Sequence, residues 1–206
     1  GIQISPDTDS RFYDAASGYK YNHLTLMGFS LTHLSGTGIP DLGDFLFIPG
    51  TGEMKLEPGT HEDPDQGYRS RYSHDKEWAS PNYYAVELAD YGVKAEMTSG
   101  VRSGMFRFIY PESDNAFIMI DMNHTLWQSC EWSNLRMIND STITGYKLVK
   151  GWGPERHVYF TATFSKKLTG LRFVQDKKPV IYNTSRFRSS YEAWGKNLMA
   201  CISFDT

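Results

Sequence analysis

The 206-residue chain has little cysteine, no long hydrophobic run and no excess of positive charge. Its two cysteines, Cys130 and Cys201, are too few for a disulfide scaffold, and the sequence leaves open whether they form one bridge or stay free. No stretch approaches the roughly 20 apolar residues of a membrane-spanning helix. The net charge of −3 provides no basic surface for nucleic acid. We therefore expect neither a membrane span nor a nucleic-acid partner.

The chain also lacks an initiator methionine and a signal peptide. It opens at Gly1 within a short stretch, residues 1–4, whose pattern indicates part of a strand. We therefore expect that residues precede Gly1 in the complete protein. For this reason the missing targeting segment says nothing about location.

A sustained helical period is missing, and alternation with a period of two takes its place. Residues 84–88 and 93–97 alternate around a tight turn at residues 90–92, which predicts a β-hairpin with its apolar side chains in one core. Residues 189–194 favour one turn of helix at most. The other expected strands are residues 44–49, 68–73, 105–110, 116–122, 142–149, 158–164, 171–174 and 198–204.

About a dozen short strands at this spacing are typical of an antiparallel β-sandwich. We predict a single all-β domain over residues 1–206, with two large sheets face to face. The aromatic content of 15% agrees, because sheets favour aromatic side chains, although sugar-binding sites use the same rings as apolar platforms. Turn-forming and polar residues predict loops at residues 5–19, 50–65 and 74–82.

Residues 28–44 begin as a strand and continue as a glycine-rich loop that keeps its polar groups. Glycine allows positive φ and the close approach of another group. Such a loop on a rigid strand suits the binding of a polar ligand, but it is also an ordinary turn in which His33 bonds to a backbone carbonyl. The polar and glycine positions are His33, Ser35, Gly36, Thr37, Gly38, Asp41 and Gly43.

The sequence by itself does not reveal an active site. Its 24 acidic residues include no pair that spacing singles out as the two carboxyl groups of a glycosidase. No phosphate-binding glycine loop, nucleophile elbow or Cys-x-x-Cys motif is present. Two loop clusters contain metal-ligand residue types, but charged runs beside prolines are more typical of solvated loops. These clusters are His61, Glu62, Asp63 and Asp65, and His74, Asp75 and Glu77.

Residues 16–22 (ASGYKYN) and 28–44 (GFSLTHLSGTGIPDLGD) together resemble the amino-terminal domain of glycoside hydrolase family 92, the calcium-dependent exo-acting α-mannosidases. The resemblance runs from residue 5 to residue 206 in the order of the family. The later runs that agree are RYSHDKEWASPNYYAVELADYGVKAEMTS, RSGMFRFIYPES, IMIDMNH, GYKLVKGWG, HVYFTATFSK and GKNLMACISFDT.

The resemblance implies a two-domain enzyme that hydrolyses terminal α-linked mannose, of an α-1,2 type, from glycans. Its catalytic carboxyl groups and most of its calcium ligands belong to a larger α/α-barrel domain downstream. This chain would then be the amino-terminal sandwich, truncated at both ends, with no catalytic residue, metal ligand or cofactor of its own. Its partners would be the mannose-terminated glycan and the downstream domain, in the periplasm, at the cell surface or in the secreted fraction.

The resemblance also places part of the sugar pocket on two loops of this chain. Asp14 would accept hydrogen bonds from adjacent sugar hydroxyls, and Tyr13, where relatives carry Trp, would stack on the sugar ring. Leu31 stands where many relatives have His, so any polar role there is lost. The other substrate-binding candidates are Ser17, Gly18, Tyr19, His33, Ser35, Gly36, Thr37 and Gly38.

Two other classes of protein fit the same sequence. One is a stand-alone carbohydrate-binding module without catalysis, and the other is a structural adapter whose loops contact no ligand. A binding module should present coplanar exposed aromatic rings on one face. An enzyme subdomain should instead expose an apolar patch where the next domain docks.

Overall fold

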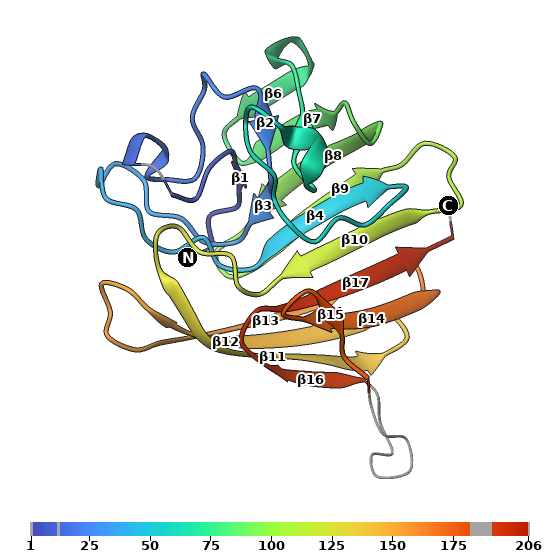
Figure 1. Ribbon diagram of the computed structural model, residues 1–206. Helices are drawn as coiled ribbons and strands as arrows, with labels where there is room; N and C mark the ends of the chain where they lie inside the picture. Colours follow the sequence, from blue (N-terminus) through green and yellow to red (C-terminus); the bar gives the residue numbers. More distant parts are fainter. Residues whose placement is uncertain (1, 12, 182–190, 206) are drawn as a thin grey trace.

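The computed structural model describes residues 2–11, 13–181 and 191–205, apart from the side chain of Asp14. Its regular structure is almost entirely β-strand (Figure 1), with single turns of 3-10 helix at η1 (Tyr13–Ala15), η2 (Pro64–Gln66) and η3 (His74–Lys76). The strands are β1 (Ser5–Asp7), β2 (Thr25–Leu26), β3 (Gly28–Ser30), β4 (Leu46–Thr51), β5 (Ser70–Arg71), β6 (Glu77–Ser80), β7 (Tyr83–Leu88), β8 (Val93–Ser99), β9 (Gly104–Ile109), β10 (Ala116–Asp121), β11 (Ser129–Asn139), β12 (Thr142–Lys150), β13 (Arg156–Thr163), β14 (Gly170–Gln175), β15 (Lys178–Pro179), β16 (Glu192–Gly195) and β17 (Leu198–Phe204).

These strands form a seven-stranded sheet in the order β1-β3-β4-β10-β17-β14-β15 and two four-stranded sheets. The four-stranded sheets have the orders β6-β7-β8-β9 and β13-β12-β11-β16, and β2 pairs with β5. The strand pairs of the described residues are antiparallel. The predicted all-β, antiparallel sandwich is therefore confirmed.

The central strands of the seven-stranded sheet are buried on both faces, which explains their nearly continuous apolar sequences. On β10, Ile118 and Ile120 enter one core, together with residues of β11 and β12, whereas Phe117 and Met119 enter a second core on the opposite face. A third core lies between β3 and the sheet β6-β7-β8-β9. In Figure 1 the two four-stranded sheets flank the long sheet above and below.

The predicted hairpin is confirmed. β7 pairs with β8 in the register Tyr84↔Met97, Val86↔Ala95 and Leu88↔Val93. Val86, Leu88, Val93, Ala95 and Met97 all belong to the third core, so their apolar side chains share one environment, as the alternation predicted.

Several predicted boundaries are wrong; for example, the strand expected at residues 68–73 is only β5, Ser70–Arg71. Four further errors change the assignment of a whole segment. The first strand is β1, within a stretch expected to be a loop, and residues 2–4 precede it. Pairing with β3 overrides the weak strand preference of Ser5–Asp7. β6 lies within the expected loop at residues 74–82. β6 is an edge strand with exposed side chains, so it shows no apolar alternation.

The other two errors lie in the sheet β13-β12-β11-β16. Residues 191–194, expected to form helix at most, lie largely in β16, while residues 189 and 190 are outside the described part of the chain. β11 went unpredicted although it has 11 residues. Its register against β12 shifts between Cys130 and Trp132 and again between Met137 and Asn139, which interrupts the period of two.

Cys130 on β11 and Cys201 on β17 are both free and buried, so the disulfide alternative is wrong. Among the described residues, no helix is long and apolar enough to cross a membrane.

Candidate functional site

The predicted pocket residues lie on two loops that follow neighbouring strands. The first loop, residues 8–24, joins β1 to β2, and the second loop, residues 31–45, joins β3 to β4. β1 pairs antiparallel with β3, so the two loops leave opposite ends of this three-residue pair at the edge of the seven-stranded sheet. They meet because the first loop folds back until Gly18 lies against Asp7 and His33. The fold therefore brings together two segments that the sequence separates.

The first loop carries Tyr13 at the surface. A backbone hydrogen bond from Ala16 N to Tyr13 O closes the turn η1, and a second one from Gly18 N to Ala15 O closes the turn that follows it. Tyr13 is 62% exposed, and its ring centroid lies 5.3 Å from that of Trp127. Asp14 lies in η1, but its side chain is outside the described part of the structure, so its contact with a sugar stays a prediction.

Asp7, at the end of β1, is the buried anchor of both loops. His33 Nε2 lies 2.8 Å from Asp7 Oδ1, and His124 Nε2 lies 2.7 Å from Asp7 Oδ2. His33 Nδ1 is also 2.7 Å from the carbonyl oxygen of Gln3. With both of its ring nitrogens bonded inside the protein, His33 braces the second loop, and a direct contact with substrate stays a prediction.

Asp7 and His33 shift each other's pKa: that of Asp7 is lowered and that of His33 is raised. Burial raises the pKa of Asp7, but the charges and hydrogen bonds of His33 and His124 outweigh it and hold this pKa well below its usual range. Burial lowers the pKa of His33, but the Asp7 carboxylate outweighs it and raises this pKa above its usual value. The pair is therefore a buried ion pair under mildly acidic conditions.

Gly18 closes the first loop against this pair. Its φ of 89° lies in the left-handed region, and a Cβ at this position would lie 2.1 Å from Asp7 Oδ1 and 3.2 Å from His33 Nε2. The carbonyl oxygen of Gly18 accepts hydrogen bonds from Thr8 N and Asp9 N. Glycine is therefore required here for both its backbone conformation and its small size.

The other residues of the first loop have structural contacts of their own. The Tyr19 hydroxyl donates a hydrogen bond to Glu77 Oε2 at 3.1 Å, and the Tyr84 hydroxyl donates one to Glu77 Oε1 at 2.6 Å. Burial raises the pKa of Tyr19 above its usual value, with Tyr72 and Glu77 adding to the effect. Ser17 is half-buried. Glu77, which the sequence grouped with His74, thus holds the first loop onto β6.

The second loop extends into solvent at its tip. Residues 35–38 are exposed, and a Cβ at Gly36 or Gly38 would meet no atom within 4 Å. The Thr37 hydroxyl donates a hydrogen bond to the carbonyl oxygen of Ile39, at 3.0 Å. The tip of the loop is thus accessible to a ligand, but it lies outside the buried contact between Gly18 and His33. It comprises Ser35, Gly36, Thr37 and Gly38.

A second buried ionic cluster holds the base of the second loop. Asp44 Oδ1 lies 3.1 Å from Lys147 Nζ, and Asp44 Oδ2 contacts Arg156 and accepts a hydrogen bond from the Thr32 hydroxyl at 2.6 Å. Burial raises the pKa of Asp44, but Lys147 and Arg156 outweigh it and lower this pKa. The sequence analysis missed this cluster and Asp7 because residues far apart in the chain pair only after folding.

A cavity of about 500 Å³ adjoins the first loop. Ser10 and Arg11 of that loop line it, together with Tyr68, Asp121 and His124. Carboxylate, amide and aromatic groups around a hollow of this size suit a polar ligand such as a sugar. The tip of the second loop does not contribute to its lining, so the two predicted loops do not enclose this cavity together.

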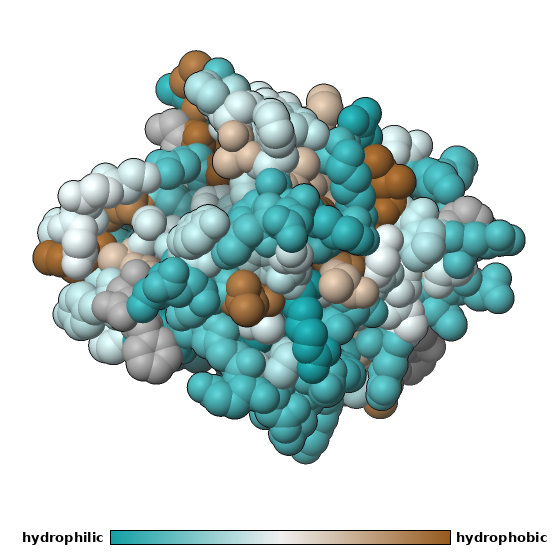
Figure 2. All heavy atoms as spheres, turned by 90° about the horizontal axis from the view of Figure 1, so that it is seen from above, coloured by the Kyte–Doolittle hydropathy of each residue, from teal (hydrophilic) through white to brown (hydrophobic). Residues whose placement is uncertain are grey.

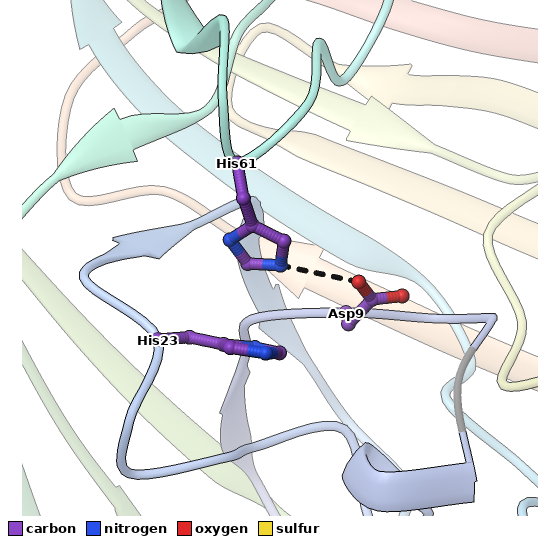
Figure 3. Close-up of side chains that lie close together, drawn as sticks. All are labelled: Asp9, His23 and His61. Carbon is purple, nitrogen blue, oxygen red and sulfur yellow. Dashed lines mark hydrogen bonds and ion pairs between the residues drawn. The ribbon is translucent and has the colours of Figure 1, made fainter.

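A further polar cluster lies at the outer side of the first loop, where Asp9, His23 and His61 point toward one another (Figure 3). One ligand atom from each lies within 4.8 Å of the others. Burial, and for His61 also the neighbouring Arg69, lowers the pKa of both histidines, so their imidazoles are neutral at neutral pH. The sequence grouped His61 with its loop neighbours, but Asp63 bonds to Gln66 and Asp65 to Arg71 instead.

The fold and these two loops define the chain as an all-β domain that presents polar loops at one edge of a sandwich. The chain belongs to glycosyl hydrolase family 92, since the sequence model of the family's N-terminal domain matches residues 1–206. The solved structure of the gh92 family glycosyl hydrolase ccman5 is similar, with a TM-score of 0.76 at 23% sequence identity. The match covers 99% of this chain and 27% of that one. A comparison with curated proteins found no match.

Proposed function

We propose that this chain is the amino-terminal domain of a calcium-dependent exo-α-mannosidase and that its two loops form one wall of the pocket for terminal mannose. The observation that carries the proposal is the family match over residues 1–206. The meeting of Gly18 and His33 at Asp7 supports it, because the two loops predicted to wall the pocket are joined at one buried carboxylate. We further propose that the complete enzyme is periplasmic, at the cell surface or secreted.

Hydrolysis of a glycosidic bond needs a carboxylic acid that protonates the leaving oxygen and a second carboxylate that activates water or attacks the sugar. We assign both groups to a downstream domain. In this chain, Asp14 would accept hydrogen bonds from sugar hydroxyls, Tyr13 would cover the ring, and the Asp7–His33 pair would hold the loops in place. These groups bind and orient the sugar and leave the proton transfers to the other domain.

The calcium ion would polarise sugar hydroxyls in the complete enzyme. Calcium prefers several oxygen ligands. Within the described residues, the only group of three close metal-ligand side chains is Asp9, His23 and His61, and two of its donors are imidazole nitrogens. This donor set does not fit calcium, so we propose that the downstream domain holds that ion.

The test is the turnover of aryl glycosides by the complete protein. We expect hydrolysis of an aryl α-mannoside, little hydrolysis of the β-mannoside or the α-glucoside, and loss of activity with a calcium chelator that calcium restores. Equal activity on all three glycosides would reject the mannose assignment. Full activity after exhaustive chelation would reject the calcium requirement.

A row of aromatic side chains favours a second candidate, a carbohydrate-binding surface. Tyr159, Tyr146, Asn134 and Trp194 lie side by side across the outer face of the sheet β13-β12-β11-β16. They line a shallow hollow of about 480 Å³. The rings of Tyr146 and Tyr159 are 4.9 Å apart but tilted by 34°, so they do not form one flat platform.

Trp194→Ala tests this second candidate, with Trp78→Ala as the matched control. Trp78 is similarly exposed but lies on β6, in the other four-stranded sheet. If the aromatic row binds glycans, Trp194→Ala should weaken binding of a mannan oligosaccharide by this chain about tenfold, and Trp78→Ala should leave it unchanged. Equal affinity in both variants would reject the surface as a glycan site.

A further inference from the structure

Asp9, His23 and His61 come from two segments that meet only in the folded chain. Asp9 and His23 lie at the two ends of the first loop, and His61 lies in a third loop, residues 52–69, between β4 and β5. His61 Nε2 is 3.1 Å from Asp9 Oδ2, about the separation of two ligands on one tetrahedral zinc ion. The ring centroids of His23 and His61 are 4.0 Å apart.

The hydrogen bonds around His23 accommodate the tautomer that metal binding needs. The Thr8 hydroxyl donates its one hydrogen to the carbonyl oxygen of Gly18 and accepts a hydrogen bond from Lys20 N. His23 Nδ1 lies 3.0 Å from that hydroxyl and donates to it in the tautomer that carries its hydrogen on Nδ1. A neutral His23 then carries a lone pair on Nε2, which has no hydrogen-bond partner among the residues that the structure describes.

His61 has a partner that suits a metal ligand. Thr25 Oγ1 lies 3.0 Å from His61 Nδ1. Arg69 Nη1 lies 3.5 Å from His61 Nδ1, but its two hydrogens have nearer acceptors in the carbonyl oxygen of Thr8 at 2.6 Å and Thr25 Oγ1 at 3.2 Å. In the metal-free chain His61 Nε2 donates a hydrogen bond to Asp9 Oδ2, because a carboxylate can only accept. A metal ion bound at Nε2 would replace that hydrogen, and Thr25 Oγ1 would then accept a hydrogen bond from His61 Nδ1. This is the outer-shell hydrogen bond that metal-bound histidines usually make.

We propose that Asp9, His23 and His61 bind a divalent transition-metal ion and that the ion is zinc. Two imidazoles and one carboxylate are a usual ligand set for zinc, with the fourth position left to water. The side chains of His61 and Asp9 are 25% and 9% exposed, so the ion can enter from solvent. Asp9 Oδ1 already accepts a hydrogen bond from Arg11 N, which orients the carboxylate.

The bound ion would tie together the two ends of the first loop and the third loop. It would thereby restrict the segment that carries Tyr13 and Asp14 without touching a sugar. The site is thus a structural clip, separate from the calcium of the proposed enzyme, and it does not depend on the proposed function.

The test is titration of the tag-free, metal-depleted chain with zinc, followed by calorimetry and thermal unfolding. We expect binding of one ion per chain and a rise in melting temperature of about 5–10 °C when zinc is 100-fold above its Kd. His23→Gln, His61→Gln and Asp9→Asn should each weaken binding at least tenfold. His157→Gln, which removes an exposed histidine from β13, is the matched control and should bind zinc as the unmodified chain does.

Two further measurements distinguish a specific zinc site from nonspecific zinc binding. Thr25→Val should weaken zinc binding about 10- to 100-fold, whereas Thr25→Ser, which keeps the hydroxyl, should restore it. Cobalt should give the visible absorption of a tetrahedral complex, and excess calcium should not displace it. Zinc binding that is absent, that is equal in the His23 and His157 variants, or that calcium abolishes would overturn the proposal.

Discussion

At the scale of single residues, Asp7 is the group on which the site depends most. Its carboxylate is fully buried, and its two oxygens contact His33 and His124 on segments far away in sequence. A buried charge is tolerated only when it is paired and hydrogen-bonded. This ion pair is therefore one of the contacts that hold both loops in position.

Asp7→Asn should lower the free energy of unfolding by about 3–5 kcal/mol, because it leaves buried histidines without their charged partner. Urea denaturation monitored by tryptophan fluorescence measures this loss. Asp114→Asn, at an exposed turn, should change the free energy by less than about 0.5 kcal/mol. Equal effects of the two substitutions would contradict the anchoring role of Asp7.

The contribution of His33 to stability should depend on pH. Since the folded-state pKa of His33 is raised, its contribution is full below the unfolded pKa of about 6.5 and declines as pH rises through the folded value. The lowered pKa of Asp7 makes that carboxylate's contribution full above about pH 3.8. The stability advantage of the unmodified chain over His33→Gln should thus be largest between about pH 4 and 6.5. An advantage that grows above this range would show that the ion pair does not stabilise the fold.

Asp14→Ala should reduce α-mannoside hydrolysis by the complete protein about 10- to 150-fold. This range corresponds to the roughly 1.5–3 kcal/mol of a hydrogen bond to a charged group. Melting temperature should barely change, because Asp14 follows the exposed Tyr13 in η1. Asp114→Ala is the matched control, and unchanged turnover in the Asp14 variant would remove Asp14 from the pocket.

At the scale of elements, the first loop is held at several points. β1 anchors its start, Gly18 closes it against Asp7, and Tyr19 bonds to Glu77 of β6. The second loop is fixed at its base by Asp44 and Lys147 but is exposed at its tip. The first loop is therefore held more rigidly than the tip of the second loop.

Gly18→Ala and Gly38→Ala separate backbone conformation from packing. Both glycines have positive φ, so alanine should cost each variant about 1–2 kcal/mol of stability. At Gly18 the new methyl group also overlaps Asp7, so this variant should lose about 1–3 kcal/mol more. Chemical denaturation of the two variants measures the difference. Equal losses of stability would mean that Asp7 and His33 move enough to accommodate the extra methyl group.

At the scale of the whole molecule, three packed cores stabilise the chain, and the seven-stranded sheet separates two of them. The face shown in Figure 2 is mainly hydrophilic, with hydrophobic side chains in scattered groups among the described residues. Among the described residues on this face, the hydrophobic side chains do not form the large apolar docking patch expected of an enzyme subdomain. The aromatic row on the sheet β13-β12-β11-β16 is one candidate for it.

The chain by itself should release no mannose from an aryl α-mannoside, with or without calcium, because the proposed catalytic groups lie outside it. It should bind free mannose with a Kd weaker than about 0.1 mM, since one wall of a pocket offers few contacts to offset the entropy of capture. A turnover assay beside calorimetric titration measures both. Calcium-dependent turnover would contradict the two-domain proposal, and tighter binding without turnover would favour the binding-module alternative.

The sequence by itself determined the class of fold. Alternation at residues 84–88 and 93–97 and the apolar runs of β4, β10 and β17 report local periodicity and burial, which neighbouring residues suffice to show. β11 and β16 escaped prediction because bulges and an edge position erase that periodicity.

The tertiary structure alone decided which polar groups meet. Asp7 pairs with His124 across 117 positions of the chain, Asp44 pairs with Arg156 across 112, and Asp9 meets His61 across 52. Local sequence fixes only the conformation of nearby residues, whereas these pairs depend on strand order and on where each loop leaves its sheet. The sequence thus indicated that His33 and Gly18 belong to polar loops, and folding determined that a buried carboxylate joins those loops.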